Sequence, residues 1–282
     1  CADVGANHDS PTLIKARSVY ETLRRFRPRS RQDLKNYVKV FLGIDVPDVR
    51  ICPEHSSPMD YLWHSFAVDF LCGAWQPQAE LGDGQTSGPS PSPSDLRLPP
   101  VTNADAIVWA NRGGGKTELA AVATLLDCLF KSGCQVRILG GSGEQSSRMY
   151  EYLTTFLQRG FAGAVDGPIR KGGCRFANGV AVEVLTQSAT SVRGQHVQKL
   201  RCDEVELFDE DVFAAAKFTT LSKENLTAGI ELISTMHRPY GIMQREVAAA
   251  TKTGVPVFKW CLWETIEKCT GRNCSQCPLW SD

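Results

Sequence analysis

Residues 110–117 read Ala-Asn-Arg-Gly-Gly-Gly-Lys-Thr, and this stretch decides the fold of the chain. It follows a short apolar run at 106–109 that predicts a strand, and it opens a helical pattern that extends from Thr117 to Phe130. The three glycines let the backbone approach phosphate oxygens and point successive N–H groups at them. A strand, a glycine loop and a helix that starts with Lys-Thr form the context of a phosphate-binding loop, or P-loop.

The residues of this loop have expected roles. We expect Lys116 to reach the β- and γ-phosphates of a nucleotide and Thr117 to place its hydroxyl on Mg²⁺. Further nucleotide contacts are expected from Asn111, Gly113, Gly114 and Gly115. Ala110 departs from the usual pattern, which begins with glycine six residues before the lysine. The alternative interpretation is a glycine-rich turn that binds no ligand.

Length and composition limit the possibilities further. A chain of 282 residues has room for one large α/β domain with appendages. Its formal net charge of zero gives no global field for nucleic acid, so DNA contacts require local basic patches. The arginines at 24–31 form either such a patch or a solvated helix end. No apolar run reaches membrane-spanning length, and the eleven cysteines share no single framework, which favours a reducing compartment.

The chain divides into four predicted segments. Residues 1–75 carry helical patterns and form a small helical N-terminal region. Residues 76–100 are rich in Gln, Gly, Ser and Pro and predict a flexible linker, because they hold too little apolar surface to offset the entropy lost on ordering. Residues 101–260 form the predicted P-loop domain, and residues 261–282 form a cysteine-rich segment.

Strand and helix patterns alternate within the P-loop domain. An Asn178-Gly179 pair between two strand-like runs predicts a hairpin. Further strands are expected at 135–139, 198–202, 229–234 and 255–260. The alternation predicts an α/β fold whose parallel sheet is built by right-handed crossovers.

Hydrolysis of a nucleotide requires acidic groups in addition to the P-loop, and Asp203-Glu204 supplies them at the end of a predicted strand. We expect Asp203 to hold Mg²⁺ and Glu204 to activate the attacking water. The long interval between Lys116 and Asp203 contains a strand–helix unit and a hairpin. It favours the P-loop ATPases that insert an additional strand between these two elements and carry a catalytic glutamate.

Other side chains are expected near the γ-phosphate. Ser234 and Thr235 end a predicted strand beside the acidic one, where a hydroxyl could sense the γ-phosphate and pass its loss to a moving element. Arg112 in the P-loop and Arg193 in a later loop each offer a guanidinium that would stabilise transition-state charge. For both arginines the alternative is a surface salt bridge.

An ordered series of motifs resembles the ATPase domain of phage large terminase subunits, the motors that package DNA. The series comprises Cys-Pro-x-His (52–55), Ser-Pro-x-Asp (57–60), the P-loop, Gly-Gly-Ser-x-x-Gln (140–145), Ser-Val-Arg-Gly (191–194), Asp203-Glu204 and Ser234-Thr235. In that family the P-loop is deviant and commonly carries an arginine, as Arg112 does here. The resemblance spans roughly residues 30–280.

The resemblance implies a RecA-like ATPase that hydrolyses Mg²⁺-ATP to move double-stranded DNA into a capsid. It also implies partnership with a portal protein and a small terminase subunit, a homo-oligomeric ring, and a location in the host cytoplasm and transiently at the procapsid portal. The family's nuclease domain would follow Asp282, so none is expected within this chain. The alternatives are a helicase or recombination ATPase, and a non-catalytic nucleic-acid-binding module with a vestigial nucleotide site.

Four cysteines near the end of the chain suggest a metal site. Cys274 and Cys277 have the spacing of metal ligands, and Cys261 and Cys269 precede them. Four thiolates would suit zinc or an iron–sulfur cluster, and the sequence does not separate the two. Cys261 also fits an apolar strand pattern, in which its side chain would face the core.

Overall fold

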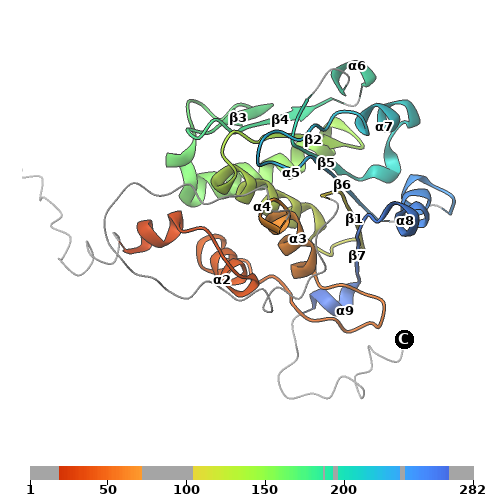
Figure 1. The fold of residues 1–282 in the computed structure, drawn as a ribbon, viewed down its shortest axis with the longest axis horizontal. Coiled ribbons are helices and arrows are strands. Elements are labelled where there is room, and N and C mark those ends of the chain that lie inside the picture. The colour runs from red at the N-terminus through yellow and green to blue at the C-terminus, as the bar shows by residue number, and fades with distance from the viewer. Residues whose placement is uncertain (1–18, 72–103, 187, 193–195, 236–238, 267–282) are drawn as a thin grey trace, which may run out of the picture. The chain divides into compact units, whose positions relative to one another are not determined.

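The computed structural model describes residues 19–71, 104–186, 188–192, 196–235 and 239–266 (Figure 1). The predicted linker at 76–100 lies outside these ranges. The chain forms two compact units, residues 1–46 and residues 47–282. Among the described residues, no helix has the length and apolar character needed to cross a lipid bilayer.

The first unit contains helix α2, Arg31–Leu42. Its N-terminus is a capping box, in which the Ser30 side chain accepts from the amide of Asp33 and the Asp33 carboxylate accepts from the amide of Ser30. Gly43 ends the helix in the left-handed conformation, with φ of 72°. Both ends of α2 agree with the sequence pattern.

The second unit is built on a seven-stranded sheet with the order β3-β4-β2-β5-β6-β1-β7. The strands are β1 (Ala106–Ala110), β2 (Gln135–Gly140), β3 (Gly173–Arg175), β4 (Ala181–Leu185), β5 (Lys199–Asp203), β6 (Gly229–Ser234) and β7 (Val257–Trp260). All neighbours are parallel except β3 and β4, which form the hairpin predicted around Asn178-Gly179. Strand β6 lies between β1 and β5, so the predicted additional strand is present and the α/β prediction is confirmed.

Helices pack on the sheet and complete the unit. They are α3 (Pro58–Leu71), α4 (Lys116–Phe130), α5 (Gly143–Phe156), α6 (Ala189–Val192), α7 (Glu210–Ala216), α8 (Ile242–Thr253) and α9 (Leu262–Thr265). Helix α4 contacts both α3 and α5, and Figure 1 shows α3 and α4 side by side. Although residues 1–75 were predicted as one region, α3 also contacts β1 and β7 in the second unit. The predicted domain boundaries themselves stay a prediction.

Side chains alternate between the two faces of β5. Leu200 and Cys202 join an apolar core with residues of α7 and α8, including Val212 and Met243. The opposite face of β5 carries Lys199, Arg201 and Asp203, which are buried although they are charged. The period-two alternation of a strand therefore separates an apolar layer from a polar one.

The polar layer contains a set of six buried charged side chains, here called the buried ion network. Its members are Asp69, Asp127, Lys131, Lys199, Arg201 and Glu231. Arg201 Nη2 lies 2.7 Å from Asp127 Oδ2, and Arg201 Nε lies 2.9 Å from Glu231 Oε2. Burial alone would raise the pKa of Glu231, but Arg201 and the hydroxyls of Ser65 and Tyr61 lower it to about 2. The network joins α3, α4, β5 and β6.

Candidate active site

The P-loop connects β1 to α4 at the carboxyl edge of the sheet. Gly113 and Gly115 have φ values of 77° and 72°, which favour glycine over residues with a side chain. A Cβ at either position would meet nothing within 4 Å, so the loop backbone borders open space. Gly115 is also the N-cap of α4 and provides no side-chain cap, which leaves the first amides of the helix suited to an anion.

The position of Ala110 explains why glycine is not required there. Ala110 is the last residue of β1, it is buried, and it pairs with Trp260 of β7 in regular parallel register. Strand geometry accommodates an alanine side chain. The departure from the usual pattern therefore falls in the strand, before the loop bends.

Two side chains donate hydrogen bonds to backbone carbonyls of the P-loop. Trp260 Nε1 donates to the carbonyl of Gly114 at 2.8 Å. The side-chain amide of Asn111 (Nδ2) donates to the carbonyl of Arg112 at 3.0 Å. A Cβ at Gly114 would lie 2.5 Å from Asn111 Oδ1 and 3.1 Å from Trp260 Nε1, so this glycine is needed for close packing. Trp260 was not among the predicted site residues, because it lies far from the loop in sequence.

The acidic pair lies directly beside Lys116 and Thr117. Thr117 Oγ1 donates to Asp203 Oδ2 at 2.9 Å, and Lys116 Nζ lies 3.4 Å from Glu204 Oε1. Glu204 adopts a φ of 53°, so the chain bends at this residue and both acidic side chains reach the same site. Ser234 Oγ donates to Glu204 Oε2 at 3.5 Å. The structure thus brings five of the predicted site residues together.

Asp203 has an unusual electrostatic environment. Burial raises its pKa to about 6, reinforced by the neighbouring Glu204 and opposed by the hydrogen bond from Thr117. A buried carboxyl with a raised pKa beside a hydroxyl and a second carboxyl is a site that a divalent cation would stabilise. The residues present therefore fit Mg²⁺.

An open cleft of about 620 Å³ lies over the P-loop. Its lining residues include Arg112, Lys116, Thr117, Glu204, Arg148 and Tyr152. Arg148 and Tyr152 project from α5 at a spacing of four, which places them on one helix face. The side chain of Tyr152 is 36% exposed and borders the cleft.

Of the other residues predicted to form a site, the structure describes Thr235 and Cys261. Thr235 follows β6 and is half-buried, and its carbonyl accepts from Ser234 Oγ at 3.1 Å. Arg193, Cys269, Cys274 and Cys277 lie outside the described residues. Cys261 is described, and it lies close to Cys52 at a Sγ–Sγ distance of 3.8 Å.

Glu206 connects the acidic loop to helix α8. Its side chain is buried, and Oε2 accepts from the amide of Met243 at 3.0 Å. Its own amide donates to Ser234 Oγ at 3.4 Å. A Cβ at Gly241 would lie 1.6 Å from Glu206 Oε1, so only glycine fits beside this carboxylate. In the sequence Glu206 is one of several acidic residues after Asp203, and nothing there marks it as different.

Comparison with solved structures extends this description. The large terminase of bacteriophage HK97 superposes with a TM-score of 0.56 at 15% identity, covering 88% of this chain and 46% of that one. The large terminase of a thermophilic bacteriophage superposes with a TM-score of 0.51 at 12% identity, covering 62% of this chain and 45% of that one. The chain has the fold of phage large terminases. The terminase resemblance is confirmed at this level.

Further comparisons define the limits of that likeness. The same thermophilic phage terminase in complex with ADP also superposes with a TM-score of 0.51, at 13% identity over 62% of this chain and 44% of that one. This chain spans less than half the length of these terminases. No protein-family model and no curated protein match it. At identities this low, the terminase fold is what the structures share.

Proposed function

We propose that this chain is the ATPase domain of a DNA-packaging terminase, which hydrolyses Mg²⁺-ATP to drive double-stranded DNA into a phage capsid. One observation carries the proposal. Lys116, Thr117, Asp203 and Glu204 converge at the carboxyl edge of the sheet, and β6 lies between the two strands that present them. The ADP complex of the thermophilic phage terminase, which has the same fold, supports a nucleotide as the ligand.

The P-loop would bind the phosphates. The loop residues Gly113, Gly115, Lys116 and Thr117 line the cleft, and Lys116 supplies a positive charge for the β- and γ-phosphates. Thr117 and Asp203 would hold Mg²⁺ through oxygen atoms, the ligands that this ion prefers. Mg²⁺ held there would supply positive charge that offsets the charge developing on the transferring phosphoryl group.

Glu204 is the proposed general base. Its carboxylate would accept a proton from the water that attacks the γ-phosphate in line with the leaving oxygen. Lys116 holds this carboxylate at 3.4 Å in the structure. Because the same ammonium group is needed at the phosphates, nucleotide binding would draw Lys116 away and release Glu204 to bind water.

Arginine side chains in the cleft would stabilise the transition state. Arg112 and Arg148 both border the cleft, from the P-loop and from α5 respectively. Either guanidinium would offset charge on the transferring phosphoryl group. The role predicted for Arg193 remains a proposal on sequence grounds.

Hydrolysis would be coupled to movement through Ser234. Its hydroxyl contacts the Glu204 carboxylate and also accepts from the amide of Glu206, whose side chain holds the N-terminus of α8. A shift of Glu204 on loss of the γ-phosphate would therefore reach α8 through three successive contacts. Thr235 is proposed to act in the same relay.

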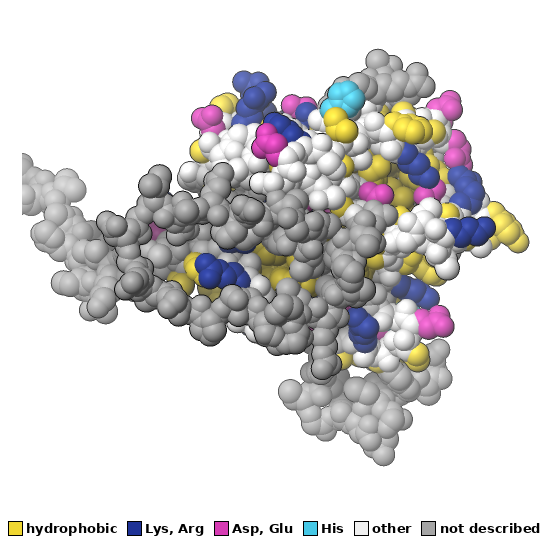
Figure 2. All heavy atoms as spheres, in the orientation of Figure 1, with side chains coloured by type: hydrophobic (Ala, Val, Ile, Leu, Met, Phe, Trp, Pro, Cys, Tyr) yellow, Lys and Arg dark blue, Asp and Glu magenta, His cyan; other side chains and the backbone are white. Residues whose placement is uncertain are grey.

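The proposed partners are double-stranded DNA, a portal protein, a small terminase subunit and further copies of the chain in a ring. The proposed location is the host cytoplasm and the procapsid portal. Figure 2 shows Lys and Arg interspersed with Asp and Glu on one face, in keeping with the zero net charge. DNA would thus be held by local contacts rather than by a global field.

ATP turnover by matched glutamine variants tests this function. Glu204→Gln removes the base and leaves the shape, so turnover is expected to fall about 10²- to 10⁴-fold while nucleotide binding persists. Glu210→Gln is the control. Glu210 lies six residues after Glu204, is exposed, and forms an ion pair with Arg245. Equal turnover by Glu204→Gln and wild type would contradict the mechanism. No turnover by wild type with DNA and portal would favour the vestigial nucleotide site.

A further inference from the structure

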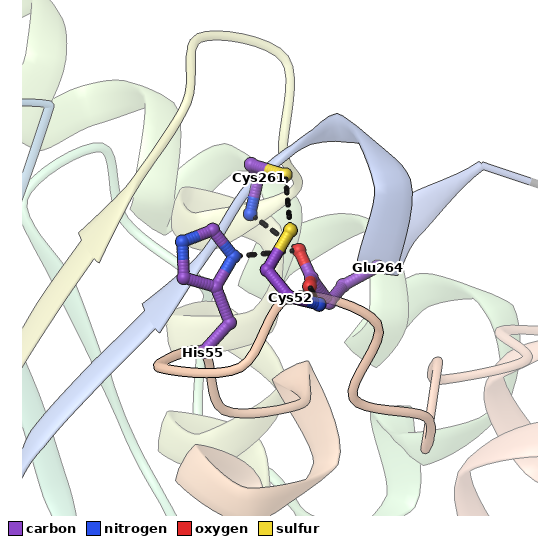
Figure 3. Close-up of side chains that lie close together, drawn as sticks. All are labelled: Cys52, His55, Cys261 and Glu264. Atoms are coloured by element: carbon purple, nitrogen blue, oxygen red, sulfur yellow. Dashed lines mark hydrogen bonds and ion pairs between the residues drawn. The ribbon is translucent and has the colours of Figure 1, made fainter. Parts of the chain in front are cut away.

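Four potential metal ligands meet near the end of β7. They are Cys52, His55, Cys261 and Glu264, whose ligand atoms all lie within 4.8 Å of one another (Figure 3). Cys52 and His55 precede α3, whereas Cys261 and Glu264 begin α9, 209 residues later in the chain. In Figure 3 the two sulfurs, the carboxylate and one imidazole nitrogen point toward one another. We call these residues the Cys–His cluster.

Backbone hydrogen bonds fix the two halves of the cluster. The amide of His55 donates to the carbonyl of Cys52 at 3.1 Å, which closes the Cys-Pro-Glu-His segment into a turn. The amide of Ser56 donates to the carbonyl of Lys259 at 2.7 Å and holds this turn against β7. The four side chains are therefore positioned by backbone structure and do not depend on mobile surface groups.

Glu264 joins the two halves. Its Oε1 accepts from the amide of Cys52 at 2.8 Å, and its Oε2 accepts from the amide of Cys261 at 2.8 Å. The same Oε2 lies 3.0 Å from His55 Nδ1. Glu264 is 3% exposed, so this carboxylate is buried among potential ligands.

The distances match those of a tetrahedral zinc site. Two thiolates bound to zinc at about 2.3 Å lie about 3.8 Å apart. The observed Sγ–Sγ distance between Cys52 and Cys261 is 3.8 Å, far longer than the ~2.0 Å of a disulfide. Nitrogen and oxygen ligands at about 2.0–2.1 Å lie about 3.3 Å apart, close to the 3.0 Å between His55 Nδ1 and Glu264 Oε2.

We propose that Cys52, His55, Cys261 and Glu264 bind one zinc ion as a closed structural site. Two thiolates with one imidazole nitrogen select zinc over Mg²⁺ or Ca²⁺, which prefer oxygen ligands. On binding, the two thiols release their protons to solvent. His55 would bind through Nδ1, so the proton that Nδ1 donates to Glu264 is given up to solvent and the bound ring carries its proton on Nε2, taken from solvent; the Nδ1–Glu264 hydrogen bond is replaced by two bonds to the same ion.

The site would stabilise the wall of the nucleotide cleft. Cys261 directly follows Trp260, whose indole holds the carbonyl of Gly114 in the P-loop. Zinc would tie this point to the segment before α3. In the sequence prediction Cys261 shared a site with Cys269, Cys274 and Cys277, whereas in the structure it lies beside Cys52, His55 and Glu264. Zinc binding at this cluster does not require ATP hydrolysis.

Zinc titration of the full chain tests the proposal. Reduced, metal-free protein competes with a chromophoric chelator for Zn²⁺, and the C269S/C274S/C277S variant provides the matched control. This control is expected to bind one zinc as tightly as the wild type does at the Cys–His cluster. C52S/C261S in the same background is expected to lose binding by more than about 100-fold, and Glu264→Gln by about 10- to 100-fold.

Alkylation of unmutated protein provides a test that does not require a variant to fold. Iodoacetamide labelling with peptide mass spectrometry is expected to show Cys52 and Cys261 protected by one equivalent of Zn²⁺. Co²⁺ in place of Zn²⁺ should give thiolate charge-transfer absorption and the visible bands of a tetrahedral ion. Protection limited to the three later cysteines, a Cys52–Cys261 disulfide in reducing buffer, or unaltered affinity in Glu264→Gln would overturn the site as proposed.

Discussion

Strand β5 places Arg201 and Asp203 on the same face of the sheet, two residues apart, in opposite electrostatic surroundings. Arg201 is fully buried and its guanidinium contacts Asp127 and Glu231. Asp203 is also buried, yet its main partner is the neutral hydroxyl of Thr117. The pKa of Glu231 falls to about 2, whereas the pKa of Asp203 rises to about 6.

The two groups of charged residues therefore have different roles: those of the buried ion network stabilise the fold, and those of the candidate active site are available to a ligand. In the buried ion network each charge is compensated within the chain. At the candidate active site the acidic groups are arranged to be compensated by something that binds. Strand β5 thus passes from the buried ion network at Arg201 to the candidate active site at Asp203, and mutations at these two residues should differ in their effects.

The largest expected effect is on the network side. Arg201→Met should lower the free energy of unfolding by about 3–5 kcal/mol, because it leaves Asp127 and Glu231 buried without their partner. Arg245→Met is the matched control, since Arg245 pairs with Glu210 at the surface and should change stability by less than about 1 kcal/mol. Urea denaturation measures both. Similar losses in the two variants would mean that the buried ion network stabilises the fold no more than a surface ion pair does.

The pH dependence of stability should have opposite signs at the candidate active site and in the buried ion network. Asp203 binds its proton more tightly in the folded state, so its contribution to stability rises as pH falls from about 7 to 4, by an amount on the order of 2 kcal/mol. Glu231 and Asp69, whose pKa values are both about 2, contribute stability above about pH 4 that is lost between about pH 4 and 2.

Asp203→Asn isolates the first of these contributions. The difference in unfolding free energy between wild type and this variant should shift in favour of wild type as pH falls from about 7 to 4. Denaturation curves at several pH values measure it, and no change in the difference over that interval would contradict a raised pKa at Asp203.

Gly241→Ala should disturb the connection between the acidic loop and α8. The new Cβ would displace the Glu206 carboxylate, with an expected loss of about 1–3 kcal/mol in unfolding free energy and a lower ratio of DNA movement to ATP hydrolysed. Gly163→Ala serves as the control, because a Cβ there meets nothing within 4 Å. If Gly241→Ala packages DNA with the efficiency of the control, Glu206 plays no part in coupling.

The smallest effect is expected for Trp260→Phe. Loss of the indole N–H leaves the Gly114 carbonyl without its donor and should weaken ATP binding by roughly tenfold, equivalent to about 1.4 kcal/mol. Nucleotide titration measures this change, and urea denaturation shows whether the fold is retained. Unchanged ATP affinity would mean that the P-loop keeps its shape without this contact.

The sequence predicted those features whose signals are local. The P-loop and the Asp203-Glu204 pair each lie where a predicted strand ends, and parallel strands bring such ends to one edge. The hairpin at Asn178-Gly179 and the caps of α2 also depend on neighbouring residues alone. These elements were predictable because the chemistry and the backbone geometry occur in the same few residues.

The remaining features depend on contacts between distant segments. Arg201 resembles any polar residue of an alternating strand until Asp127 and Glu231 are placed around it. Cys261 was grouped with the cysteines that follow it, whereas the fold brings it to Cys52. Arg148 and Glu206 have no distinguishing neighbours in sequence. Their roles depend on which helix packs on which strand. Local sequence patterns do not predict these contacts between distant segments.

The bend at Glu204 has one more consequence. A residue with a side chain in the left-handed region is less stable than glycine there, by about 1–2 kcal/mol. Glycine would suit this backbone, but it would bring no carboxylate to the cleft. The chain therefore keeps a small conformational strain at the residue proposed to activate water.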